Sequence, residues 1–165
     1  MFDNGYKIRS AMVKDFEDIS VLKEQVQQLH LEGRPDLYTP ASGSLDKHTY
    51  EMWLASEDME VFVIEDKEQQ LLAYMILDIK KSGDTNPILR DRTIVFIRSI
   101  GVSEVCRGKG IGKILMHKAF DYCREIQAES VELNVLEFNK SAIRFYESLG
   151  FKTKSRQLEW TGEEK

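Results

Sequence analysis

Three glycines, Gly108, Gly110 and Gly112, and three basic residues stand close together near the middle of the chain, in the stretch IGVSEVCRGKGIGKIL at residues 100–115. An apolar, β-branched run precedes the glycines and an amphipathic run follows them, which predicts a strand, a turn and the start of a helix. The first N–H groups of a helix lack partners within the helix, and the helix dipole favours negative charge at that end. Glycine leaves room for an anion to lie on the backbone. The stretch therefore predicts a phosphate or pyrophosphate site, with additional charge from Arg107 and Lys109.

Two common nucleotide-binding motifs do not fit this stretch. A P-loop needs four residues between its first glycine and a Gly-Lys pair followed by Ser or Thr. Here three residues separate Gly108 from Gly112, and Ile114 stands where the hydroxyl is needed. The dinucleotide fingerprint G-x-G-x-x-G also fails, because the spacing is G-x-G-x-G and the motif lies in mid-chain. For the stretch taken alone, a turn that merely joins strand to helix remains an alternative.

With its surroundings, the turn resembles a known family. RGKGIG fits R-x-x-G-x-G, SIGV precedes it, and NKSAIRFYESLGF fits N-x-x-A-x-x-F-Y-E-x-x-G-F. This combination resembles the GNAT superfamily of acyl-CoA-dependent N-acetyltransferases, clearly over residues 93–154. The opening IRSA and KDFEDI is similar to the family's first strand and helix. Met12 departs from the pattern, because the family often has a hydroxyl N-cap there.

The resemblance implies acetyl-CoA or another acyl-CoA as cosubstrate, and no metal. The pyrophosphate would lie on backbone amides of residues 108–113, and the pantetheine arm would pair with the preceding strand like an added strand. The implied cofactor-binding residues are Ile100, Gly101, Val102, Arg107, Gly108, Lys109, Gly110, Ile111, Gly112, Lys113, Asn139 and Ser141.

Asn139 and Tyr146 lie seven residues apart on one predicted helix. Their side chains share a face and are separated by about 10 Å along the axis. The resemblance implies that Asn139 binds the pantetheine arm and that Tyr146 is the general acid that protonates the departing thiolate. From spacing alone, Asn139 also fits an N-cap, Tyr146 a core-packing stripe and Ser141 an ordinary first-turn position.

The general base stays unassigned. Many family members carry a carboxylate on the strand before the turn, but no Asp or Glu lies between Thr93 and Ser103. Deprotonating a lysine-like amine of pKa near 10.4 costs about 4.6 kcal/mol at pH 7, against about 1 kcal/mol for an α-amine. The missing carboxylate therefore favours an acceptor amine of low pKa, as a hypothesis. The carboxylates that are geometric possibilities are Asp78, Glu104, Glu132 and Glu137.

The resemblance places the acceptor at the loop between the first two helices, within HLEGRPDLYTPASGS at residues 30–44. Candidate substrate residues are Arg34, Tyr38 and Arg98. Ordinary turn chemistry explains the loop equally well, and Arg98 could instead pair with a nearby acid. The acceptor class is a primary amine: a small molecule such as an amino sugar or polyamine, or a peptide α-amine.

Hydrophobic periodicity predicts one domain over residues 1–165, with a mixed sheet and helices packed on it. The resemblance implies the GNAT fold, an α/β (α+β) fold with a mixed, mostly antiparallel central sheet and helices on both faces. Loops are predicted over 32–44 and 82–91. The predicted strands are 6–11, 60–66, 70–81, 93–102 (buried on both faces), 130–138 and 151–160, and the predicted helices 14–31, 46–57, 111–127 and 139–150.

The composition limits the class of protein and the partners that are expected. The chain has 165 residues, 42% hydrophobic and 31% charged, with a net charge of -5, which disfavours nucleic acid as a partner. No signal sequence or membrane-spanning stretch is visible, and Cys106 and Cys123 match no zinc or redox spacing, so a cytoplasmic location is expected. A tail strand ending in Trp160 could pair in a homodimer. A non-catalytic acyl-CoA-binding or sensing module and an unrelated nucleotide-binding module remain alternatives to the enzyme.

Overall fold

A computed structural model describes residues 5–40, 45–82, 88 and 90–162. These residues form two compact units, Met1–Asn134 and Val135–Lys165. The predicted loops lie partly outside the described residues, at 41–44, 83–87 and 89. The single-domain expectation stays a prediction.

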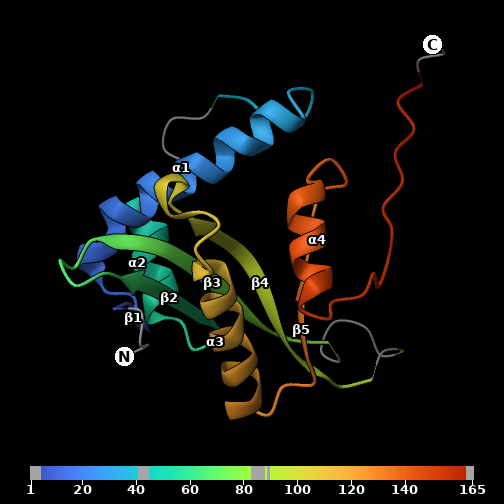
Figure 1. Ribbon diagram of the computed structural model, residues 1–165. Coiled ribbons are helices and arrows are strands. Elements are labelled where there is room, and N and C mark those ends of the chain that lie inside the picture. Colours follow the sequence, from blue (N-terminus) through green and yellow to red (C-terminus); the bar gives the residue numbers. More distant parts are fainter. Residues whose placement is uncertain (1–4, 41–44, 83–87, 89, 163–165) are drawn as a thin grey trace. The chain divides into compact units, whose positions relative to one another are not determined.

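The first unit is built on a five-stranded sheet in the order β1-β2-β3-β4-β5 (Figure 1). The strands from β1 to β4 pair antiparallel, and β5 pairs parallel to β4. The prediction of a mixed, mostly antiparallel sheet is confirmed. The strand bounds are β1 Lys7–Ser10, β2 Met59–Glu65, β3 Leu71–Lys81, β4 Thr93–Val102 and β5 Ser130–Leu133.

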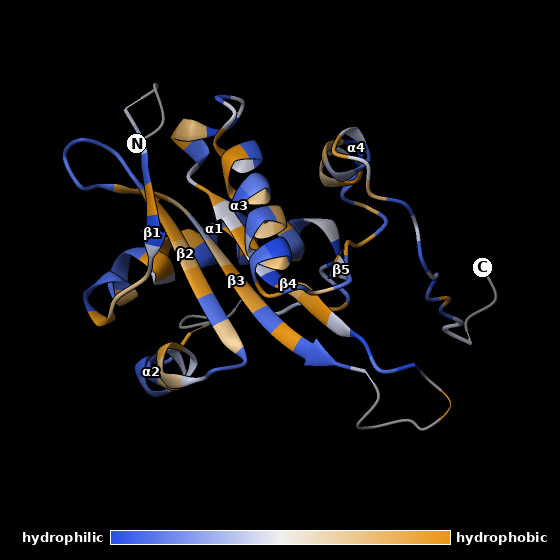
Figure 2. Cartoon of the chain, turned by 90° about the horizontal axis from the view of Figure 1, so that it is seen from below, coloured by the Kyte–Doolittle hydropathy of each residue, from blue (hydrophilic) through white to orange (hydrophobic). Residues whose placement is uncertain are grey.

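Helices cover both faces of this sheet, because β2 and β3 carry apolar side chains on both sides. On one face, Val61, Val63 and Tyr74 pack against α1 (Phe16–Gly33) and α2 (Lys47–Ala55). A short 3-10 turn η1 (Val13–Asp15) precedes α1 and contacts both helices. On the other, the Phe62 ring lies 5.7 Å from that of Tyr122 on α3 (Ile111–Glu125). Figure 2 shows α2 and α3 on opposite sides of the sheet. No helix in the described residues is long and apolar enough to cross a membrane.

The described residues of the second unit form one helix, α4 (Lys140–Ser148), with both ends capped. The Asn139 side chain accepts a hydrogen bond from the Ala142 amide at 3.0 Å. At the other end Gly150 has φ +91°, and the Phe151 amide donates to the Tyr146 carbonyl at 3.1 Å, as in a Schellman motif. The predicted N-cap and the predicted glycine after the helix are confirmed.

Three strand predictions need correction. Residues 151–160 are not a strand: residues 152–162 are exposed and irregular, with Leu158 89% and Trp160 91% exposed. Strand 130–138 ends at Leu133. Strand 93–102 is not buried on both faces throughout, because Arg98 is exposed. Alternation describes only where side chains point, whereas a strand also needs a neighbouring backbone for its hydrogen bonds.

Candidate active site

The glycine turn joins β4 to α3 and has an open backbone surface. Gly108 (φ +77°) and Gly110 (φ +83°) both adopt the left-handed conformation that side chains disfavour, and Gly110 is the N-cap of α3. A Cβ atom added at either glycine would meet nothing within 4 Å. The space beside these two α-carbons is therefore open, and glycine is required at both positions by the backbone conformation rather than by internal packing.

The amides of this turn have no acceptor within the part of the chain that the structure describes, from Gly108 through Gly112. The next two amides, of Lys113 and Ile114, donate to the Gly110 carbonyl at 3.0 and 3.3 Å. A run of unpaired donors at the start of a 15-residue helix fits an anion with several oxygens. Lys109 and Lys113 are exposed beside it. The Arg107 guanidinium is already engaged by its own segment, since it lies 3.7 Å from the Glu104 carboxylate and donates to the Val102 carbonyl at 3.3 Å.

Residues 100–102, predicted to receive the pantetheine arm, lie where β4 loses one neighbour. β4 pairs with β3 along its length, whereas β5 pairs only with Ile94–Ile97. In the described residues of the first unit, the remainder of β4 has no strand partner on that side. An extended ligand can add to such an edge, so the structure is compatible with this expectation.

Gly101 has a packing role that the sequence does not reveal. A Cβ at this position would lie 2.5 Å from the Tyr74 ring and 3.0 Å from Val26 of α1. Gly101→Ala is therefore expected to lower the free energy of unfolding by about 1–3 kcal/mol, because a buried methyl group would force both neighbours aside. Urea unfolding measures this change. An unfolding free energy within about 0.5 kcal/mol of the wild type would contradict the close packing.

A β-bulge places Arg98 beside the helices. Ile76 pairs with Ser99 and Leu77 with Ile97, so Arg98 is the extra residue of β4. Its Nε donates to both carboxylate oxygens of Asp78, at 2.9 and 3.1 Å. The Arg98 guanidinium carbon also lies 5.9 Å from the centre of the Trp53 ring. The pairing of Arg98 with a nearby acid, left open from the sequence, is thus present.

Ser99, next to Arg98, points toward the same helical layer. Its hydroxyl lies 2.8 Å from the Tyr74 hydroxyl. Burial raises the pKa of Tyr74 to about 12, although the Ser99 hydrogen bond opposes the shift. The Tyr74 hydroxyl therefore stays protonated at neutral pH.

The four carboxylates considered as a base are all engaged in other contacts. Asp78 pairs with Arg98, Glu104 with Arg107 and Glu137 with Lys140, while Glu132 accepts from the Ser130 hydroxyl at 3.1 Å. None of them stands apart as a base, and the assignment stays open.

Residues 34–38, which follow α1, contact one another and the last turn of α1. Arg34 donates to Asp36 from Nε at 2.8 Å and from Nη2 at 2.6 Å. The Tyr38 ring stacks on His30, with the ring centres 5.2 Å apart. Burial, followed by the charge of Lys23, lowers the pKa of His30. Arg34 and Tyr38 thus contact their own segment, and their role toward a substrate stays a prediction.

Lys23 and Trp53 are residues of this region that the sequence analysis did not single out. Lys23 lies one turn from Ile19 and Val26 on α1, so it stands inside the apolar stripe that faces the sheet. A lysine within such a stripe was the available signal. The described residues contain no group of three or more His, Cys, Asp or Glu residues that could hold a metal ion.

In the second unit, α4 presents Asn139 and Tyr146. Asn139 uses its side-chain oxygen as the N-cap, and its side-chain NH₂ has no partner in the described residues. The Tyr146 ring lies 5.3 Å from that of Phe145 and 5.7 Å from that of Phe151. Burial raises the pKa of Tyr146. Ser141 is exposed in the first turn. Asn139 thus caps the helix and Tyr146 packs against neighbouring rings, as their spacing also allowed. The roles of Asn139, Ser141 and Tyr146 toward a ligand stay predictions.

Comparisons with known proteins give one family. The sequence model of the acetyltransferase (GNAT) family matches residues 23–151 of this chain. An uncharacterized N-acetyltransferase of Methanocaldococcus jannaschii is 29% identical over 134 residues, which cover 76% of this chain and 58% of that protein. The chain thus spans little more than half the length of this curated relative.

Solved structures share the fold of this chain. Crystal structures of mutants of a Bacillus halodurans protein match with a TM-score of 0.89 and 28% identity, over 93% of this chain and 98% of theirs. Glucosamine-6-phosphate N-acetyltransferase of Arabidopsis thaliana matches with a TM-score of 0.70 and 23% identity, over 96% and 99%. The second likeness concerns the fold alone.

Proposed function

Since the chain belongs to the acetyltransferase (GNAT) family, we propose that it transfers an acetyl group from acetyl-CoA to a primary amine. The observation that carries the proposal is the run of unpaired amides from Gly108 to Gly112 at the start of α3, beneath open space. These amides, with Lys109 and Lys113, would hold the pyrophosphate of the cosubstrate. Bound acetyl-CoA supplies the thioester carbon that the amine attacks.

The reaction needs no covalent enzyme intermediate. The amine nitrogen forms a bond to the acetyl carbonyl carbon, and the carbon–sulfur bond breaks. The proton of the amine leaves to water, because no carboxylate of β4 is available. Tyr146 gives its hydroxyl proton to the departing sulfur and regains one from water. Products are an amide and the CoA thiol.

A second function, an acyl-CoA-binding module without turnover, is favoured by one observation. The carboxylates available as a base are tied up in the contacts described above. Such a module would bind acetyl-CoA and release no thiol with any amine.

Thermal unfolding with acetyl-CoA, ATP and NAD tests the binding step. A ligand at 100 times its dissociation constant stabilises by about 2.7 kcal/mol, which raises Tm by roughly 5–10 °C. We expect this rise with acetyl-CoA and none with ATP or NAD. A larger rise with ATP would contradict the proposal, and thiol release in an amine screen separates enzyme from binding module.

Gly110→Ala is expected to weaken acetyl-CoA binding at least about tenfold, since each 1.4 kcal/mol of lost interaction is tenfold. The new Cβ would stand in the open space above the turn, and φ +83° would disfavour the local backbone. Gly150→Ala is the matched control, because Gly150 also has positive φ (+91°) and open space around it. Calorimetric titration should give similar acetyl-CoA affinities for this control and the wild type. Equal weakening by both substitutions would mean that backbone strain alone is responsible.

A further inference from the structure

Lys23 is a half-buried cation that has no counterion among the described residues. It lies on the face of α1 that packs toward the sheet, and in the described residues its ammonium makes no ion pair or hydrogen bond. Burial lowers the pKa of Lys23, and the nearby positive charge of Arg98 lowers it further. The helix and the strand that carry these two cations are in contact, since α1 packs against β4 and Val26, one turn after Lys23, lies 3.0 Å from a Cβ placed at Gly101 of β4.

Arg98 leaves its two terminal nitrogens available. The hydrogen bonds to Asp78 use only Nε, and in the described residues Nη1 and Nη2 have no partner. The Arg98 side chain is 50% exposed, whereas that of Asp78 is 9% exposed. The buried carboxylate thus fixes the base of the guanidinium and leaves its outer edge open.

One carboxylate does not balance two cations. Close like charges raise the free energy of a partly buried site, and an anion between them removes this cost. Arginine terminal nitrogens suit the paired oxygens of carboxylates and phosphates, and a lysine adds a point charge. The arrangement stands out in a chain whose net charge is -5.

The position of this pair relates it to the loop after α1. Lys23 acts electrostatically on His30, and the His30 ring stacks on Tyr38. On the other side, Trp53 of α2 lies beside Arg98. The two cations are therefore neighbours of the segment that was predicted to meet the acceptor.

We propose that Lys23 and Arg98 together bind a carboxylate or phosphate group of the amine acceptor. This inference rests on the proposed acetyl transfer. It names the acceptor class as amines that carry an anionic group, and Lys23 as a specificity-determining residue.

The test compares matched pairs of amines at constant ionic strength: ethanolamine with phosphoethanolamine, and glycinamide with glycine. For the wild type, at least one anionic member is expected to raise Tm and to show a kcat/KM at least about tenfold above its neutral partner, with kcat/KM expressed per unprotonated amine because the two members differ in amine pKa. The pair that responds distinguishes phosphate from carboxylate. Equal Tm shifts and equal kcat/KM for both members of both pairs would overturn the proposal.

Lys23→Met removes the charge and keeps the unbranched side chain. The ratio of kcat/KM for the anionic amine to that for its neutral partner, here called the preference, should therefore fall to near unity. Arg98→Lys keeps the charge but loses the paired donors, and should lower the preference in the same direction. Lys47→Met, an exposed lysine on α2, is the control and should retain it. A preference unchanged in Lys23→Met would overturn the proposal.

The two cations could alternatively serve a phosphate of the cosubstrate. In that case Lys23→Met would weaken acetyl-CoA binding, and this result would also overturn the proposal. Tm shifts need no turnover: a shift by anionic amines without thiol release would refute acetyl transfer and keep the anion site. Thiol release with no preference for anionic amines would support acetyl transfer and refute the anion site.

Discussion

Replacing Tyr146 with phenylalanine is expected to lower kcat about 100- to 1,000-fold, because general acid catalysis contributes factors of this size. The ring contacts with Phe145 and Phe151 would remain, and only the hydroxyl proton would be lost. Acetyl-CoA affinity should therefore stay close to the wild-type value. Thiol release at saturating substrates gives kcat, and calorimetry gives the affinity.

The pH dependence of kcat has a definite direction. An acid acts in its protonated form, and burial raises the pKa of Tyr146 above its ordinary value of 10.0. The limb of the kcat profile that Tyr146 sets should fall only above pH 10, and Tyr146→Phe should lack it. Tyr122→Phe on α3 is the matched control, because this tyrosine also has a pKa raised by burial and packs against Phe62. A kcat for Tyr146→Phe that equals that of the control would remove Tyr146 from the mechanism.

Features fixed by local rules could be predicted from the sequence. Asn139 caps α4 and Gly150 ends it, because capping depends on a few adjacent residues. The bounds of β4 at Thr93–Val102 and the start of α3 at Ile111 also agree with the pattern. Gly108 and Gly110 have the positive φ that a turn of bare backbone suggests.

Features that depend on distant partners could not be predicted. The alternation over residues 151–160 does not form a strand, and Leu158 and Trp160 are exposed. The bulge at Arg98 follows from the register of β3 against β4, which no local pattern contains. The pairing of Arg98 with Asp78 and its influence on Lys23 depend on that register too.

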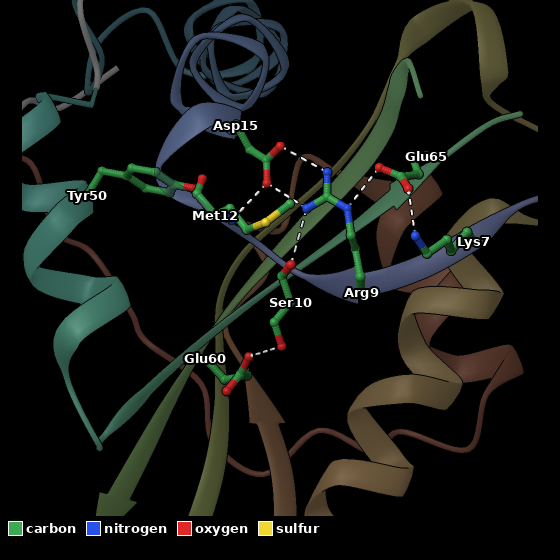
Figure 3. A network of polar contacts seen from close by, with 8 residues as sticks. All are labelled: Lys7, Arg9, Ser10, Met12, Asp15, Tyr50, Glu60 and Glu65. Atoms are coloured by element: carbon green, nitrogen blue, oxygen red, sulfur yellow. Dashed lines mark hydrogen bonds and ion pairs between the residues drawn. The ribbon is translucent and has the colours of Figure 1, made fainter. Parts of the chain in front are cut away.

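Asp15→Asn is expected to lower the free energy of unfolding by about 3–5 kcal/mol, and Tm by about 10 °C, because it breaks one side of a buried charge network. In that network Arg9 of β1 donates to Asp15 at 2.6 and 2.9 Å and to Glu65 at 2.8 Å (Figure 3). The side chains of Arg9, Asp15 and Glu65 are 14%, 4% and 7% exposed. The exposed pair of Arg34 and Asp36 is the matched control, and Asp36→Asn should leave Tm close to the wild-type value.

The difference in unfolding free energy between the wild type and Asp15→Asn should disappear at acid pH. Burial, the largest single influence, would raise the pKa values of Asp15 and Glu65. The hydrogen bonds and positive charge of Arg9, together with the Met12 amide at Asp15 and Lys7 at Glu65, outweigh it and lower both pKa values below their ordinary values of 3.8 and 4.5. Groups with a lowered pKa stabilise the fold above their unfolded pKa, and this contribution is lost as pH falls through the folded pKa. The unfolding free energies of the wild type and Asp15→Asn should therefore converge below about pH 4. A constant difference down to pH 2 would mean that Asp15 acts by packing rather than by charge.

The network also explains why the turn at Met12 forms although Met12 has no hydroxyl to serve as N-cap. Asp15 accepts the Met12 amide at 2.7 Å, and the Tyr50 hydroxyl donates to the Met12 carbonyl at 2.8 Å (Figure 3). The carboxylate that pairs with Arg9 of β1 is therefore also the group that orders η1, the turn from which α1 starts. Since α1 carries Lys23, loosening this start is expected to weaken the proposed preference for anionic amines as well as the fold. Asp15→Asn should reduce that preference at temperatures below its own Tm, and an unchanged preference would show that α1 is positioned by its apolar contacts with the sheet alone.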